Sequence, residues 1–136
     1  MSQVVLLLMR MLGYLPLPWL RALGVALGWL LHALVKRRRQ VALTNLTLCF
    51  PRLSPTERAR WVKAHFRVFA QAWLDRAWLW HGSSDRVKQR VRLCGDLSVL
   101  QDDRQPVVIF APHFVGLDVG WTMLALSLDR ALTTIY

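Results

Sequence analysis

The pattern of apolar and polar positions makes the N-terminal part of the chain the most hydrophobic. Residues 4–20 are apolar apart from Arg10, and residues 22–35 contain no Lys, Arg, Asp or Glu. Each uninterrupted run is shorter than the ~20 apolar residues that a bilayer-spanning helix requires. Pro16 and Pro18 also interrupt a continuous helix, because proline lacks the backbone N–H. The pattern therefore predicts either two short helices that enter one leaflet or one tilted, marginal span.

A second helix is predicted to start at Ser54. Ser54 suits the N-cap, Pro55 the first helical position, and Glu57 stands three residues after the cap, which is the capping-box arrangement. Gly82 suits the C-terminal stop. Apolar residues then recur at spacings of three and four, which places them on one core-facing stripe. The stripe consists of Val62, Phe66, Phe69, Trp73, Ala77 and Trp80.

After residue 90 the pattern changes to short strands and turns. Residues 90–93 alternate between basic and apolar, residues 95–100 open a short helix, and residues 107–111 form a continuous apolar run typical of a strand buried on both faces. Residues 116–128 return to helical spacing. The expected fold class is α/β, with N-terminal membrane-associated helices followed by the start of a sheet domain. We expect a membrane-associating segment at 1–40 and the first part of the sheet domain at 41–136.

The net charge of +10 lies entirely in the first half. Residues 1–70 hold eleven of the eighteen basic residues and a single acid, whereas the basic and acidic residues of 71–136 balance. Such a surface suits anionic lipid, nucleic acid or an acidic carrier protein, and the apolar flanks favour lipid. We expect four basic residues to lie at the cytoplasmic headgroups and to contact membrane or carrier protein: Lys36, Arg37, Arg38 and Arg39. The alternative is a buried core helix followed by a solvated basic turn.

The two cysteines indicate neither a metal site nor a disulfide scaffold. Cys49 and Cys94 have no zinc-ligand spacing, and a reducing cytoplasmic environment is the simpler interpretation. We expect no metal and no cofactor.

His113 and Asp118 are the candidate catalytic pair, because they lie where the predicted strand 107–111 ends and the next helix begins. A spacing of five residues lets the carboxylate fold back and accept a hydrogen bond from one imidazole N–H, which leaves the other nitrogen as a general base. A hydroxyl held there would become a nucleophile, and helix N-terminal N–H groups would help to stabilise an oxyanion. Neither a serine nor a cysteine has nucleophile-elbow surroundings, so direct attack by an acceptor hydroxyl is the simpler mechanism. The alternative is a structural histidine.

Three stretches resemble the lipid A biosynthesis acyltransferases, the late lauroyl or myristoyl acyltransferases of Gram-negative bacteria. They are the basic cluster leading into residues 45–51, the helix start at 54–58, and residues 111–118, which carry the H-x4-D/E motif. The resemblance implies transfer of a fatty acyl group from acyl carrier protein to a hydroxyl of a lipid A precursor, at the cytoplasmic face of the inner membrane. His113 would match the base of the family, and Asp118 its partner, where many members have Glu.

The resemblance covers about the first half of a family member. We therefore expect the 136-residue chain alone to have little or no transferase activity with a carrier-protein thioester and a lipid A precursor, because part of the site is missing.

Two other functions are open. A glycerolipid acyltransferase shares the His113/Asp118 spacing, although Phe50 and Pro51 argue against it. A non-catalytic membrane- or nucleic-acid-binding fragment would bind through residues 37–39, although no nucleic-acid-binding fold is recognisable. A further hypothesis is that a basic helix face attracts an acidic acyl carrier protein and steers it to the site. The alternative is that this face is only solvated. This face consists of Arg58, Arg60, Lys63 and Arg67.

Overall fold

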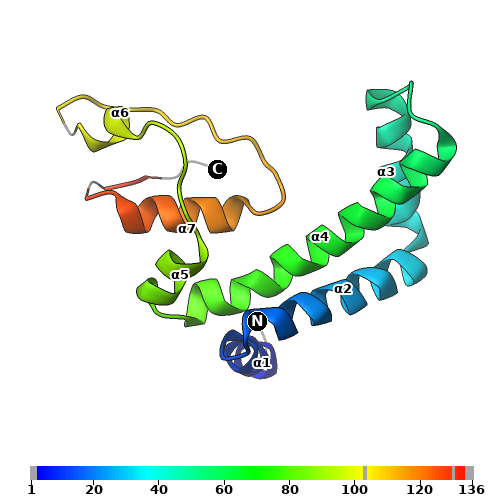
Figure 1. The fold of residues 1–136 in the computed structure, drawn as a ribbon, viewed down its shortest axis with the longest axis horizontal. Coiled ribbons are helices and arrows are strands. Elements are labelled where there is room, and N and C mark those ends of the chain that lie inside the picture. The colour runs from blue at the N-terminus through cyan, green and yellow to red at the C-terminus, as the bar shows by residue number, and fades with distance from the viewer. Residues whose placement is uncertain (1–2, 103, 130, 134–136) are drawn as a thin grey trace. The chain divides into compact units, whose positions relative to one another are not determined.

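The computed structural model describes residues 3–102, 104–129 and 131–133, which form two compact units (Figure 1). One unit comprises residues 15–75, and the other comprises the described parts of 1–14 and 76–136. The long helix α4 (Pro55–His81) runs through the boundary at residues 75 and 76. The domain boundary expected near residue 40 stays a prediction.

The unit of residues 15–75 is built from α2 (Leu17–Leu34), α3 (Lys36–Cys49) and the first part of α4. Pro16 is the N-cap of α2 and Pro18 lies in its first turn, where a missing N–H costs nothing. The preceding helix α1 (Gln3–Gly13) ends before these prolines. The predicted break between two short N-terminal helices is therefore confirmed.

Helices α2 and α4 lie side by side and antiparallel (Figure 1), and two glycines of α2 allow the close approach. A Cβ added at Gly24 would lie 2.5 Å from Cγ of Gln71, and one at Gly28 would lie 2.6 Å from Cα of Arg67. Contacts this short exist only where the side chain is a hydrogen atom. Backbone-to-backbone packing therefore joins α2 to α4.

The predicted capping box at the start of α4 is confirmed. The backbone N–H and the hydroxyl of Ser54 both donate to Oε2 of Glu57, at 2.8 and 2.7 Å, and the N–H of Glu57 donates to Oγ of Ser54 at 3.3 Å. The helix ends at His81, before Gly82, as predicted. A Cβ at position 82 would lie 2.3 Å from the carbonyl oxygen of Trp78, which explains the glycine.

The core-facing stripe of α4 was predicted only in part. Within the unit of residues 15–75 the buried apolar positions of α4 are Val62, Phe66, Ala70 and Leu74, whereas Phe69 and Trp73 are 47% and 45% exposed. The buried residues follow a row of i, i+4 positions, which is the ridge that helices most often use for packing. In the other unit Ala77 is buried, as predicted, and Trp80 is exposed.

The other unit packs its short helices around Trp78 and Val87, which are 2% and 1% exposed. Its elements are α1, the end of α4, α5 (Ser84–Arg90), α6 (Ser98–Gln101) and α7 (Leu117–Ser127), with α5 packed on α7. The short helix α6 follows an Asx turn in which Oδ1 of Asp96 accepts from the N–H of Ser98 at 2.9 Å. Helices were predicted at the positions of α6 and α7, and both are confirmed.

The predicted strands are not present among residues 3–102, 104–129 and 131–133. Residues 107–110 are irregular, with Val108 and Phe110 96% and 91% exposed, although the sequence predicted a strand buried on both faces. A strand needs a neighbouring backbone for its N–H and C=O groups, and none of the described segments supplies one. The described structure is therefore helical, and the α/β sheet is not seen in it.

Of the described helices, α2 alone is long and apolar enough to cross a bilayer by length and composition. This helix lies within the predicted membrane-associating segment of residues 1–40.

Candidate functional site

His113 lies in the irregular segment before α7, and its side chain is exposed. The segment enters α7 through Gly116, the N-cap, which has φ 92° and ψ 3°. This left-handed conformation favours glycine because a side chain would clash with the backbone there. The glycine between His113 and Asp118 therefore fixes the turn that brings the motif into the first turn of α7.

Asp118 occupies the first turn of α7, where a carboxylate interacts favourably with the helix dipole. Its Oδ2 accepts a hydrogen bond from Nε of Arg76 at 2.6 Å, and the two side chains are 45% and 35% exposed. No hydrogen bond joins His113 to Asp118 in the described part of the chain. The structure therefore places both predicted catalytic residues around the N-terminus of α7 without showing their pairing.

Arg76 was not predicted as part of this site. It lies 42 residues before Asp118, and no sequence pattern linked it to the motif. Because the guanidinium holds one oxygen of the carboxylate, the second oxygen stays available as an acceptor. Such an arrangement orients Asp118 while leaving it able to accept from an imidazole N–H.

The described residues contain no group of three His, Cys, Asp or Glu side chains that could hold a metal ion. Cys49 and Cys94 are both exposed free thiols.

The basic cluster of residues 36–39 forms the first turn of α3. Lys36, Arg37 and Arg38 are exposed, whereas Nη1 of Arg39 donates to the carbonyl oxygen of His32 at 2.8 Å. Arg39 therefore caps the C-terminal end of α2, where a cation also interacts favourably with the helix dipole. The other three are the residues open to an anionic surface.

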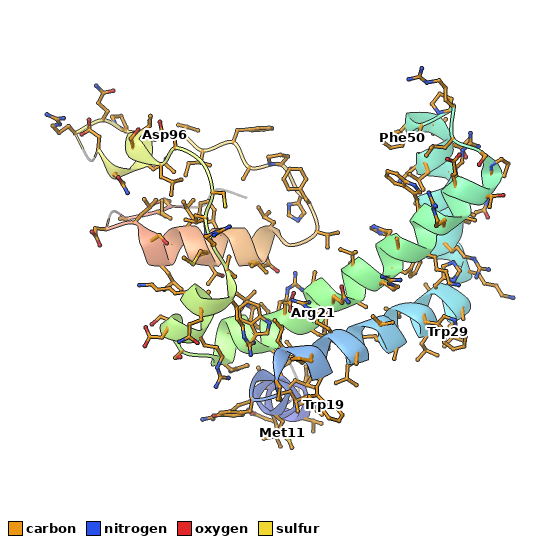
Figure 2. All side chains as sticks on the ribbon, viewed as in Figure 1. Met11, Trp19, Arg21, Trp29, Phe50 and Asp96 are labelled. Atoms are coloured by element: carbon orange, nitrogen blue, oxygen red, sulfur yellow. The ribbon has the colours of Figure 1, made fainter. Side chains whose placement is uncertain are left out.

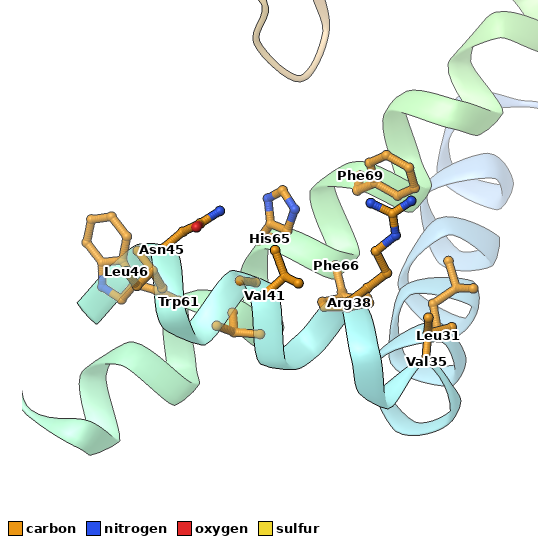
Figure 3. Close-up of a pocket in the computed structure, with 12 residues that line it drawn as sticks. Leu31, Val35, Arg38, Val41, Asn45, Leu46, Trp61, His65, Phe66 and Phe69 are labelled. Carbon is orange, nitrogen blue, oxygen red and sulfur yellow. The ribbon is translucent and has the colours of Figure 1, made fainter. Parts of the chain in front are cut away.

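A groove of about 690 Å³ lies between α3 and α4 (Figure 3). Its walls are mainly apolar, with Val41, Leu46 and Phe66 among them, and Arg38 and His65 add polar groups from the two facing helices. The groove was not predicted, because the sequence gave no helix boundary within residues 40–50.

The basic face suggested for carrier-protein steering is only partly open. Arg58 donates to the carbonyl oxygen of Pro51 at 2.8 Å and to Oγ1 of Thr47 at 3.3 Å, so it links the start of α4 to the end of α3. Arg60, Lys63 and Arg67 are exposed. Steering by these three residues stays a prediction.

Comparison with known proteins decides the family. Residues 2–136 match the family described as bacterial lipid A biosynthesis acyltransferase. The chain belongs to this family. The resemblance inferred from residues 36–51, 54–58 and 111–118 is thereby confirmed, and it extends over nearly all of the chain.

Three relatives of the chain have names that place them in lipid A biosynthesis. The lipid A biosynthesis palmitoleoyltransferase of Escherichia coli K12 is 32% identical over 114 residues, which are 82% of the chain and 37% of the relative. The lipid A biosynthesis acyltransferase of Haemophilus influenzae is 30% identical over 114 residues, which are again 82% of the chain and 37% of the relative. The lipid A biosynthesis lauroyltransferase of E. coli K12 is 28% identical over 108 residues, or 78% of the chain and 35% of that relative.

The chain thus spans just over a third of the length of the relatives it matches. No solved structure matches the chain.

Proposed function

We propose that the protein transfers a fatty acyl group from acyl carrier protein to a hydroxyl of a lipid A precursor, in lipopolysaccharide biosynthesis. The observation that carries this proposal is the family match over residues 2–136. Relatives named palmitoleoyltransferase and lauroyltransferase use two different acyl groups, which supports a fatty acyl donor without fixing its length.

In the proposed reaction His113 acts as the general base. Its free ring nitrogen takes the proton of the acceptor hydroxyl as the oxygen attacks the thioester carbonyl. The tetrahedral intermediate then collapses, and the carrier thiol leaves with a proton returned by the imidazolium. No acyl group becomes attached to the protein in this scheme, in agreement with the absence of a nucleophile-elbow sequence.

Asp118 orients the imidazole and stabilises its charged form in this mechanism. The hydrogen bond of 2.6 Å from Arg76 holds one carboxylate oxygen, and the second accepts the imidazole N–H when the segment around His113 closes on the first turn of α7. Only residues 114–117 separate His113 from Asp118 along the chain, so the proposed movement involves the segment that leads into α7.

We also propose that the N-terminal helices attach the protein to the cytoplasmic face of the inner membrane. The apolar helices α1 and α2 supply the hydrophobic contact, and the exposed cations Lys36, Arg37 and Arg38 supply the electrostatic one. Attachment to this membrane brings the protein to the bilayer that holds its proposed lipid acceptor.

A chimera tests the function directly. The matching segment of the E. coli palmitoleoyltransferase is replaced by this chain, and the purified chimera is given acyl carrier protein thioester with either a lipid A precursor or glycerol 3-phosphate. Mass spectrometry should show one acyl group added to the lipid A precursor. Acylation of glycerol 3-phosphate instead would replace the proposal by the glycerolipid function, and no transfer to either acceptor by a folded chimera would contradict it.

A further inference from the structure

We propose that α2 lies in the plane of the membrane interface instead of crossing the bilayer, with one apolar face in lipid and the opposite face covered by α4. The inference rests on the membrane attachment proposed above. It is carried by what α2 contacts along its length and by what it leaves exposed.

The middle of α2 packs against α4, which carries charged residues. Gly24 and Gly28, at the centre of the helix, lie directly against Gln71 and Arg67 of α4, with hypothetical Cβ distances of 2.5 and 2.6 Å. Arg67 is exposed. The depth of α2 in a membrane therefore fixes the depth of this arginine.

Contacts at both ends keep the two helices together. Near the start of α2, Arg21 pairs with the buried Asp75 through two N–O distances of 3.0 Å. Near its end, the ring of His32 stands edge-on to Phe66, with 5.5 Å between the centroids. Separating α2 from α4 would break these contacts and remove Arg21 from a buried carboxylate.

A bilayer-spanning orientation would place the midpoint of α2 at the bilayer centre and bring Arg67 and Gln71 to the same depth. An arginine at the bilayer centre is unfavourable, because its charge loses its hydration there. In the in-plane orientation α4 stays on the water side of α2, so Arg67 and Lys63 remain hydrated. Keeping the α2–α4 contacts therefore favours the in-plane orientation.

The outward face of α2 is suited to lipid. Trp19 and Trp29 are 67% and 61% exposed and project away from α4 (Figure 2), with Leu23 and Leu30 also exposed. Tryptophan concentrates at the membrane–water interface, and helices lying there bury their apolar face about 5–10 Å deep. The exposed cations of residues 36–38 follow α2 directly in the chain, and they would attract anionic lipid headgroups. We therefore assign this face to an anionic lipid surface and not to a protein.

The test measures depth at three exposed alanines of the outward face: Ala22, Ala26 and Ala33. Each is replaced by cysteine in a chain carrying Cys49→Ser and Cys94→Ser, then spin-labelled, and the protein is bound to vesicles containing phosphatidylglycerol. Collisions with oxygen and with a water-soluble nickel complex give the depth of each label. We expect the three labels to show the same shallow depth.

A spanning helix would give a different profile, with Ala26 deepest and Ala33, seven residues on, shallower by about 10 Å, because each residue rises 1.5 Å. This result would overturn the in-plane orientation and leave the proposed function intact. Low collision rates with both reagents would show that protein covers the face, which would also overturn the inference. Labels exposed only to the nickel complex would contradict the membrane attachment itself.

Discussion

The absence of a Cβ atom at Gly24 and Gly28 lets α2 pack closely against α4. We predict that Gly28→Ala lowers the free energy of unfolding by about 1–3 kcal/mol, because the new Cβ would lie 2.6 Å from Cα of Arg67 and neither backbone can yield locally. Chemical denaturation measures this change. The matched control is Gly120→Ala in α7, where nothing lies within 4 Å, and where alanine should be neutral or stabilise by up to ~1 kcal/mol. Equal effects at the two positions would contradict the packing of α2 on α4.

The capping box at the start of α4 makes that helix end sensitive to acid. Hydrogen bonds from the hydroxyl and then the backbone N–H of Ser54 lower the pKa of Glu57 from its ordinary value of 4.5. A lowered pKa in the folded state means that the contribution of Glu57 is complete above pH 4.5 and is lost as the pH falls through the lower folded value. We predict that the amide NMR signals of residues 54–58 titrate below this pH.

Glu57→Gln is the control for that titration, because the amide keeps the capping geometry but does not ionise in this range. An unchanged titration in this variant would assign it to another group. Replacing the cap itself, Ser54→Ala, should destabilise the start of α4 by about 1 kcal/mol.

At the scale of elements, α2 and α4 are joined by an ion pair whose carboxylate is buried. Asp75 is 7% exposed, and Arg21 is its partner at 3.0 Å. A double-mutant cycle of Arg21→Met and Asp75→Asn should show a favourable coupling of up to about 1 kcal/mol in the free energy of unfolding, because the Arg21 side chain is 39% exposed and water screens the pair. Additive effects would mean that the pair does not contribute to holding the helices together.

The sequence predicted best those elements whose signals are local. The boundaries of α4 follow from Ser54, Glu57 and Gly82, and the start of α2 follows from its prolines, because capping and proline geometry act within a few residues. The strand at 107–111 could not be tested locally in this way. Its apolar run is typical of a buried strand. A strand also needs a second segment with which to form hydrogen bonds, and none of the described residues provides one.

The candidate site shows the same limit. His113, Gly116 and Asp118 could be placed at a helix start from the sequence, since the motif is continuous. Arg76 could not be assigned to Asp118, because the contact joins positions 42 residues apart and depends on tertiary packing.

On the scale of the whole molecule, the positive charge of the first half should determine binding to anionic membranes. Each basic residue near such a surface contributes about 1 kcal/mol, so Arg37→Gln combined with Arg38→Gln should weaken binding to phosphatidylglycerol vesicles roughly thirtyfold. Vesicle sedimentation at low salt measures this loss, and added salt should reduce it. Arg92→Gln, an exposed change in the charge-balanced half, serves as control and should alter binding much less.

The central claim is that His113 is the base that activates the acceptor hydroxyl. The most direct measurement is the single-turnover rate of acyl transfer by the purified chimera described above, comparing His113→Ala with the unmodified motif. We predict a loss of about 10²–10⁴-fold, with Asp129→Asn, which changes an exposed acid outside the motif, close to the unmodified rate. A His113→Ala chimera that is folded and transfers the acyl group at the unmodified rate would contradict the account.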